Sequence, residues 1–205
     1  MIRWDLETDQ FDLGQWLNCT VKTERSGLSE DGKLFAYYAL DYRRKSQIEG
    51  GPHVSISRPP YFSALALWWA GGMHTGGAQW VGPREIGFCE DVVGNPDKGS
   101  LPSELVVSSL GSPSMSWWHE ASTKVSNDRA FQNGVPFRIL SLGCYDLDGS
   151  SLDAQWADVD HRGRLLLARK GKIYVRDANG ERELIDLNPL TFRPLEPPQW
   201  ATEWP

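Results

Sequence analysis

The chain has 205 residues, with 27 acidic and 21 basic side chains and a formal net charge of −6. This length suits one domain with a real core, and we expect a single β-rich domain over residues 1–205. Phosphate binding needs clustered Lys and Arg, and the longest basic run, Arg43-Arg44-Lys45, adjoins Asp41 and Glu49 and is typical of a solvated loop. The charge pattern therefore argues against a nucleic-acid partner.

The chain offers no sign of export, membrane insertion or cross-linking. Its first residues alternate and are charged, and no apolar run approaches the roughly 20 residues that cross a bilayer. Three cysteines are odd in number, widely spaced and without a Cys-x-x-Cys pair: Cys19, Cys89 and Cys144. They predict neither a disulfide framework nor a zinc ribbon. We expect a cytoplasmic protein with no membrane partner and no cofactor.

Strand patterns dominate the first half of the chain. Residues 19–24 alternate and residues 33–41 are rich in aromatics, so with the turn at residues 26–32 they predict a hairpin. Glycine-rich residues 71–77 predict a loop, and Gly82-Pro83-Arg84 predicts a hairpin turn. Further strands are expected at residues 53–57, 63–69, 78–81, 85–90 and 104–110.

The second half begins with a break in this pattern. Residues 112–131 predict a short helical or irregular insertion, with Ser116 as a capping residue. Gly171 and Asn179-Gly180 predict tight hairpin turns, and three prolines near the end predict an extended tail that carries Trp200 and Trp204. The later strands are expected at residues 137–142, 164–169, 172–176 and 183–186.

One short cassette occurs twice, over residues 28–37 and 159–168. In each copy a polar turn with a glycine opens directly into an apolar run. The turn glycines Gly32, Gly82 and Gly163 lie 50 and 81 residues apart, and 81 is close to twice the roughly 40 residues of a propeller blade. We therefore predict an all-β fold, either a small β-propeller-like structure or an open repeat antiparallel sheet, with four to five units.

The same cassettes resemble the turn and inner strand of WD40-like and TolB-type propeller repeats. The resemblance rests on Leu28-Ser29-Glu30-Asp31-Gly32-Lys33-Leu34 and on Asp158 to Leu165. The usual Pro-Asp-Gly turn is altered, because Glu30 and His161 stand where those repeats have proline. Residues 4–9 and 56–61 are also similar to a family of uncharacterised bacterial cytosolic proteins, which implies no activity.

A search for catalytic constellations finds none of the common ones. The sequence has no nucleophile elbow, phosphate-binding loop, dinucleotide fingerprint or His-Glu-x-x-His motif. The histidines His53, His74, His119 and His161 lack the spacing of metal ligands, and residues 146–153 match an Asp-Gly turn better than a calcium loop. We expect a non-catalytic protein, with an enzyme left open as an alternative.

Ten tryptophans supply the candidate binding surface. Most are expected in the core, but neighbours in a strand point to opposite faces, so one of each adjacent pair must meet a second layer, a loop or a partner. A plain hairpin loop at residues 71–77 is the competing interpretation. The candidate protein-binding residues are Trp68, Trp69, His74, Trp80, Trp117 and Trp118.

Three functional hypotheses follow from these observations. The first is a cytosolic protein that binds a protein partner, such as a bacterial immunity protein that neutralises a basic toxin, because the chain is acidic and lacks a catalytic motif. The second is a small-ligand-binding protein or enzyme with a site at the mouth of the β-repeat, near His74 and His119. The third is a structural module of a larger assembly.

Overall fold

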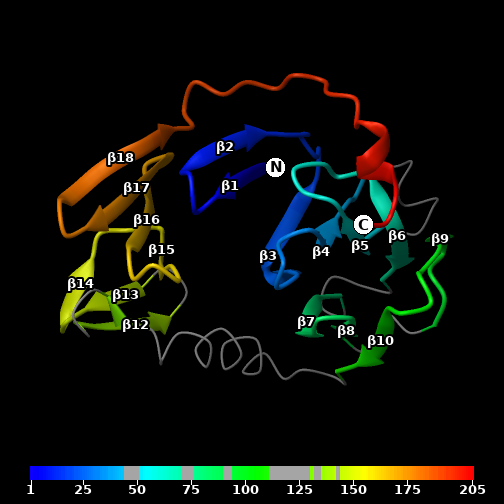
Figure 1. Cartoon of the computed structure of the whole chain (residues 1–205). Coiled ribbons are helices and arrows are strands. Elements are labelled where there is room, and N and C mark those ends of the chain that lie inside the picture. Colours follow the sequence, from blue (N-terminus) through cyan, green and yellow to red (C-terminus); the bar gives the residue numbers. More distant parts are fainter. Residues whose placement is uncertain (44–50, 71–75, 90–93, 111–129, 132–134, 142–143) are drawn as a thin grey trace. The chain divides into compact units, whose positions relative to one another are not determined.

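The computed structural model describes residues 1–43, 51–70, 76–89, 94–110, 130–131, 135–141 and 144–205. These residues form β-strands in mostly antiparallel sheets with no α-helix among them, which confirms the predicted all-β class (Figure 1). No closed propeller is seen in this part of the chain. The insertion expected at residues 112–131 lies outside the described residues, except for the short strand β11 (Ala130–Phe131). No described helix has the length and apolar character of a membrane span.

The chain divides into two compact units. Unit 1 comprises residues 1–5, 10–114 and 192–205, and unit 2 comprises residues 6–9 and 115–191. The expectation of a single domain stays a prediction.

Unit 1 is built on a five-stranded antiparallel sheet in the order β3-β4-β5-β6-β9. Its strands are β3 (Thr20–Leu28), β4 (Phe35–Leu40), β5 (His53–Ser57), β6 (Ala64–Trp69) and β9 (Lys98–Gly99). The predicted first hairpin is confirmed, but Ser26 lies within β3 rather than in the turn, because β3 continues past an irregularity in its pairing with β4.

Two smaller sheets complete unit 1. A hairpin joins β1 (Ile2–Asp5) to β2 (Gln10–Leu13), and its tip, Leu6–Asp9, belongs to unit 2. The other sheet has the order β10-β8-β7, with β7 (Ala78–Gly82), β8 (Glu85–Phe88) and β10 (Val106–Ser109). Strands β8 and β10 pair in parallel, which departs from the expected antiparallel arrangement. A 3₁₀ helix, η2 (Gln199–Thr202), lies near the end of the chain.

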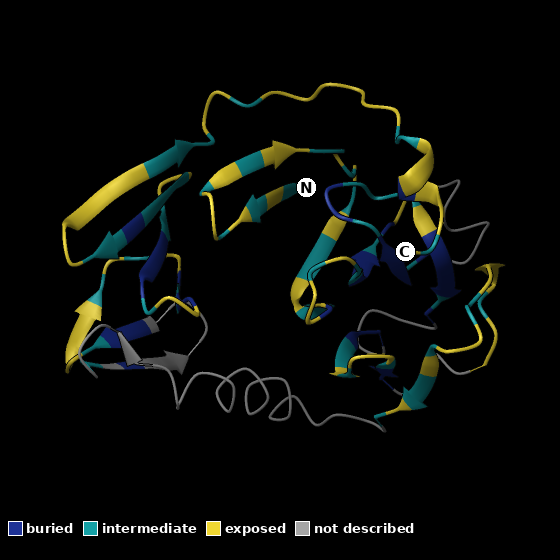
Figure 2. Ribbon diagram, viewed as in Figure 1, coloured by how far each residue is buried: buried dark blue, intermediate teal, exposed yellow. Residues whose placement is uncertain are grey.

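The central strands of the main sheet, β4, β5 and β6, are buried on both faces (Figure 2). One face forms the larger core, in which Tyr38 and Trp68 pack with Phe88 of β8. The opposite face buries Tyr37 and Leu67. Strands covered on both sides need no polar alternation, which explains why β4 and β6 have nearly continuous apolar sequences.

Unit 2 contains two four-stranded antiparallel sheets, each with its strands in chain order. Besides β11, the first contains β12 (Val135–Ser141), β13 (Cys144–Leu147) and β14 (Ser150–Leu152). The second contains β15 (Trp156–Val159), β16 (Leu165–Arg169), β17 (Lys172–Asp177) and β18 (Gly180–Asp186). Phe137 and Tyr145 of the first sheet share a core with Leu165 and Leu167 of the second.

The two predicted cassettes adopt the same turn. The Gly32 N–H donates to the Ser29 carbonyl at 2.8 Å, and the Gly163 N–H donates to the Asp160 carbonyl at 2.9 Å. The two glycines have φ angles of 69° and 70°, a conformation that glycine adopts without steric cost. Gly82 differs, because it ends β7 and is not among the described glycines with positive φ. The predicted hairpin turn at Gly82-Pro83-Arg84 is confirmed, because Gly82 of β7 pairs with Glu85 of β8 across it.

Candidate functional site

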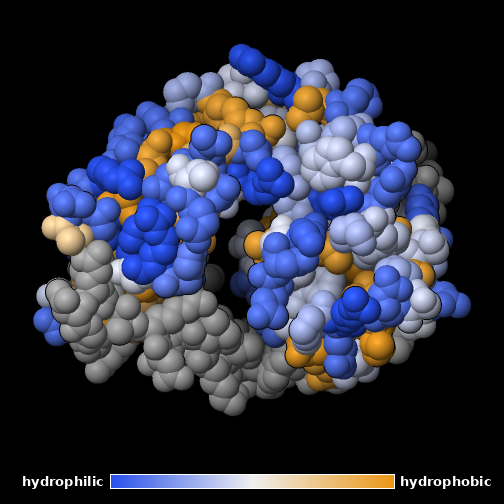
Figure 3. All heavy atoms as spheres, viewed as in Figure 1, coloured by the Kyte–Doolittle hydropathy of each residue, from blue (hydrophilic) through white to orange (hydrophobic). Residues whose placement is uncertain are grey.

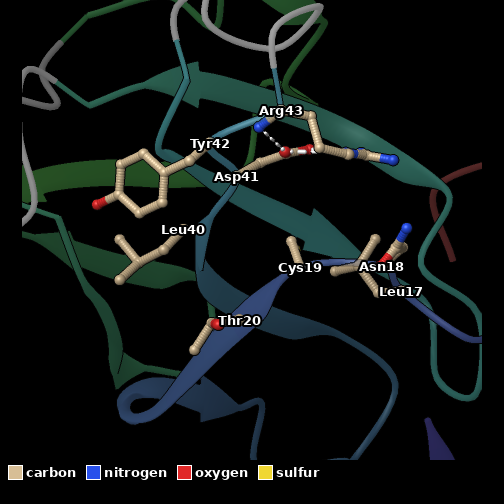
Figure 4. A pocket seen from close by; sticks show the side chains of 8 residues that line it. All are labelled: Leu17, Asn18, Cys19, Thr20, Leu40, Asp41, Tyr42 and Arg43. Atoms are coloured by element: carbon tan, nitrogen blue, oxygen red, sulfur yellow. Dashed lines mark hydrogen bonds and ion pairs between the residues drawn. The ribbon is translucent and has the colours of Figure 1, made fainter.

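An open pocket of about 470 Å³ lies on unit 1, beside the start of β3 and the end of β4 (Figure 4). The register brings its two lining segments together, since Thr20 pairs with Leu40. In Figure 4, Leu40 and Tyr42 stand on one side of the hollow and Cys19 on the other. The lining residues are Leu17, Asn18, Cys19, Thr20, Leu40, Asp41, Tyr42 and Arg43.

The charged pair of this pocket is Asp41 with Arg43. Arg43 donates to Asp41 Oδ1 from its backbone N–H at 3.0 Å and from Nε at 2.9 Å, and Nε lies 3.1 Å from Oδ2. Nη2 also donates to Oδ2, which makes the pair bidentate. The Asp41 side chain is 5% exposed and that of Arg43 is 57% exposed. The hydrogen bond and charge of Asp41 raise the pKa of Arg43.

The pocket also contains a thiol that is held in its protonated form. Burial raises the pKa of Cys19, and the negative charge of Asp41 raises it further. Since the thiolate is the nucleophilic form of cysteine, this environment suppresses its reactivity. Within the part of the chain that the structure describes, no group of three His, Cys, Asp or Glu side chains could hold a metal ion.

An aromatic row continues on the same face of the sheet. Ala39 pairs with His53, so the alternation of the strand places the residue two positions later, Asp41, on that face too. The His53 ring lies 6.4 Å from Tyr37 and 5.7 Å from Trp69, with both contacts edge-to-face. Burial lowers the pKa of His53, against an opposing effect of its contact with the Gly51 carbonyl. These ring contacts stabilise the sheet beside the pocket.

A second exposed feature of unit 1 lies where residues 13–16 meet the C-terminal segment. We define the C-terminal patch as Leu13, Trp16, Leu195 and Trp200, which are 41–51% exposed. Such large apolar side chains are typical of recognition surfaces when they cluster. Figure 3 shows hydrophobic and hydrophilic side chains interspersed along the segment that leads to η2.

Polar contacts hold the backbone of this patch in place. The Gln15 side chain accepts from the Phe62 N–H at 2.7 Å and donates to the Leu195 carbonyl at 2.9 Å. Arg58 donates to the Trp200 carbonyl at 2.7 Å, and its guanidinium lies 4.9 Å from the centre of the Trp200 ring. The patch is therefore presented by an ordered backbone rather than by a free tail.

Unit 2 contains a dense ion-pair cluster around Arg164. Its guanidinium donates to Asp160 at 2.7 Å, to Asp9 at 2.8 Å and to the carbonyl of Leu6 at 2.8 Å. Arg182 also donates to Asp9, at 3.0 Å. Arg164 is 5% exposed, so these contacts use the donors of a buried guanidinium. The cluster fastens residues 6–9 within unit 2 and has the character of a structural element.

The six residues predicted to bind a partner have different environments. Trp68 is 2% exposed and its indole donates to a backbone carbonyl at 3.2 Å, so it has no surface to offer. Trp69 is half-buried, with the ammonium of Lys98 5.2 Å from its ring centre. Trp80 is also half-buried and donates to a carbonyl at 3.2 Å. The remaining three, His74, Trp117 and Trp118, lie outside the described residues.

Sequence reasoning missed both exposed sites of unit 1. Residues 43–45 were interpreted as a solvated loop, although Asp41 directly follows a buried strand and Arg43 is close enough to pair with it. That spacing is the available signal for the pocket. For the C-terminal patch, the prolines predicted an extended tail with Trp200, but nothing local indicates that Gln15 holds it.

Comparison with known proteins adds no assignment: no family model, no curated protein and no solved structure matches this chain. The resemblance to WD40-like and TolB-type repeats therefore stays a prediction. A functional proposal has to rest on the geometry of the exposed sites.

Proposed function

We propose that this chain is a non-catalytic protein-binding protein that docks its partner through the C-terminal patch. The observation that carries this proposal is a set of four large apolar side chains, 41–51% exposed, beside a backbone pinned by Gln15 and Arg58. Aromatic side chains dominate binding energy at interfaces, and an ordered backbone reduces the entropy lost on association.

The wider biological setting is part of the same proposal. A net charge of −6 favours a basic partner, and an immunity protein that neutralises a basic toxin in the cytoplasm is one such case. We also propose that the two four-stranded meanders of unit 2 are propeller-like repeats, since their strand number and order match those of a blade. The competing hypothesis, which the experiment has to exclude, is that the chain is a structural module of a larger assembly.

The test is affinity capture with the full chain at micromolar concentration, followed by quantitative mass spectrometry. We expect Trp16→Ala and Trp200→Ala to lose the partner by about tenfold or more, as anchor residues do. Trp156→Ala is the matched control, because Trp156 is 41% exposed on unit 2 and lies outside the patch. A partner bound equally by all three variants, or no partner above background, would contradict the proposal.

A small-ligand-binding function is the second candidate, and the pocket at Asp41 favours it. The pocket has the mixed lining of a ligand site, with aliphatic and aromatic walls around one buried carboxylate. The enzyme alternative was placed near His74 and His119, which lie outside the described residues.

A further inference from the structure

We propose that the pocket at the end of β4 binds a guanidinium group, which pairs with the Asp41 carboxylate in place of the chain's own Arg43. The ligand class is a guanidino compound, either free or as the arginine side chain of a protein. This site is separate from the C-terminal patch and does not depend on it.

The first argument is the geometry that Arg43 already displays. Its Nε and Nη2 approach both oxygens of Asp41, which is the fork-to-fork arrangement by which a carboxylate receives a guanidinium. The carboxylate is therefore presented to the pocket in the orientation that a guanidinium ligand requires. Lysine-type ammonium groups lack this planar fork and gain less from it.

The second argument is the unequal burial of the two partners. Asp41 is 5% exposed and is fixed at the end of a buried strand, whereas Arg43 is 57% exposed. Loss of any partner would be unfavourable for the buried carboxylate, so Arg43 leaves only as another cation arrives, and its exposed side chain has solvent to move into. A ligand would exchange one guanidinium for another, and the buried carboxylate would stay paired throughout.

The third argument is the lining of the pocket. Asp41 and Arg43 are the charged side chains among the lining residues, so the site carries one negative charge once Arg43 leaves. Leu17, which also lines the pocket, offers apolar contact to the aliphatic stem of an arginine, as such stems prefer.

The test measures binding of methylguanidinium to the full chain by isothermal titration calorimetry. We expect saturable binding to the wild type with a dissociation constant on the order of 1 mM, and none for methylurea, its neutral analogue. Arg43→Ala should bind about threefold to tenfold tighter, because it removes the internal competitor. Asp41→Asn should abolish binding.

Arg3 and Asp12 provide the matched control. They form an exposed ion pair with side chains 52% and 55% exposed, and neither residue lines the pocket at Asp41. Arg3→Ala therefore uncovers a carboxylate without a pocket and should leave methylguanidinium binding unchanged. Trp16→Ala should also bind as the wild type does, so failure of the docking proposal and failure of this one are distinguishable.

The source of the guanidinium is resolved by two further probes. L-Arginine and a blocked Gly-Arg-Gly peptide share the side chain but differ at its backbone. Tighter binding of L-arginine indicates a free compound, tighter binding of the peptide indicates a protein side chain, and either result supports the site. No saturable binding to Arg43→Ala, or equal gains in Arg43→Ala and Arg3→Ala, would overturn the proposal even if Asp41→Asn fails to fold.

Discussion

Replacement of Arg164 with methionine tests whether the ion-pair cluster is structural. Arg164 is 5% exposed and bonds three oxygen atoms, those of Asp160, Asp9 and the Leu6 carbonyl. Methionine keeps an unbranched aliphatic stem but provides no donor. The side chain of Asp160, which is 0% exposed, would then lose its guanidinium while keeping its hydrogen bonds from the backbone of the turn.

The magnitude follows from the burial of the stranded carboxylate. Removal of one partner from a buried ion pair costs about 3–5 kcal/mol, because the remaining charge is desolvated and loses its counter-charge. The total stability of a domain is about 5–15 kcal/mol, so the variant should be severely destabilised. Arg164→Lys keeps the charge but not the fork, and we expect a smaller loss of about 1–3 kcal/mol.

Urea unfolding followed by tryptophan fluorescence gives the change in free energy. Hydrogen exchange of residues 6–9 gives a local readout, because those residues are held by Arg164 and Arg162. Arg162→Ala is the control, since Arg162 bonds exposed carbonyls of Leu6 and Glu7 and should cost less than about 1 kcal/mol. Asp160→Asn combined with Arg164→Met should cost less than the sum of the single changes.

A loss below about 1 kcal/mol for Arg164→Met would refute this reasoning. It would mean that Asp160 regains solvent at little cost. Unchanged exchange at residues 6–9 would show, independently, that Arg164 does not hold that segment.

Three further predictions concern unit 1. Burial lowers the pKa of His53, so the unfolded state takes up the proton more readily than the folded state. The free energy of unfolding should therefore fall from pH 7.5 to 5.5, by at most about 1.4 kcal/mol per pH unit. His53→Gln should flatten this dependence. Burial and then Asp41 raise the pKa of Cys19, so its thiol should label slowly at neutral pH, and Asp41→Asn should speed labelling at that site in peptide mass spectra. Gly99 has φ +81°, and a Cβ there would lie 2.0 Å from a carbonyl oxygen of β6, so Gly99→Ala should lower the free energy of unfolding by more than about 2 kcal/mol. Gly32 has φ +69° but open space around it, so Gly32→Ala should lower it by about 1 kcal/mol.

Each of these predictions has an opposing result. Equal pH slopes for the wild type and His53→Gln would show that the histidine keeps its ordinary pKa in the fold. Labelling of Cys19 at the rate of a free thiol would contradict its burial. Equal melting temperatures for the two glycine variants would mean that β9 moves away from β6 at no cost.

Local sequence signals predicted much of the fold because they reflect local physics. The turns at Gly32 and Gly163 need a residue that accepts positive φ, and each opens into a strand whose apolar side chains enter a core. The predicted strand at residues 53–57 coincides with β5. Trp68 and Trp69 do point to opposite sides of β6, with Trp68 in the larger core and Trp69 against His53.

Features that depend on distant residues were not predictable in this way. The parallel pairing of β8 with β10 joins segments separated by residues 89–105, and no local pattern specifies it. The fastening of Asp9 by Arg164 and Arg182 spans more than 150 residues of sequence. Gly82 was predicted from its local turn sequence, and it does border a hairpin, but its backbone does not share the positive φ of Gly32 and Gly163.

The two Asp–Arg pairs show why similar sequence patterns have different consequences. Asp160 and Arg164 are both buried, and the arginine is bound from three directions, so exchange with a ligand would leave several groups unpaired. Asp41 is equally buried, but Arg43 reaches it from solvent beside an open pocket. The two pairs therefore differ in the exposure of the arginine side chain, whereas both carboxylates are buried. A buried acid with an exposed partner leaves one position at which another cation of the same shape is able to bind.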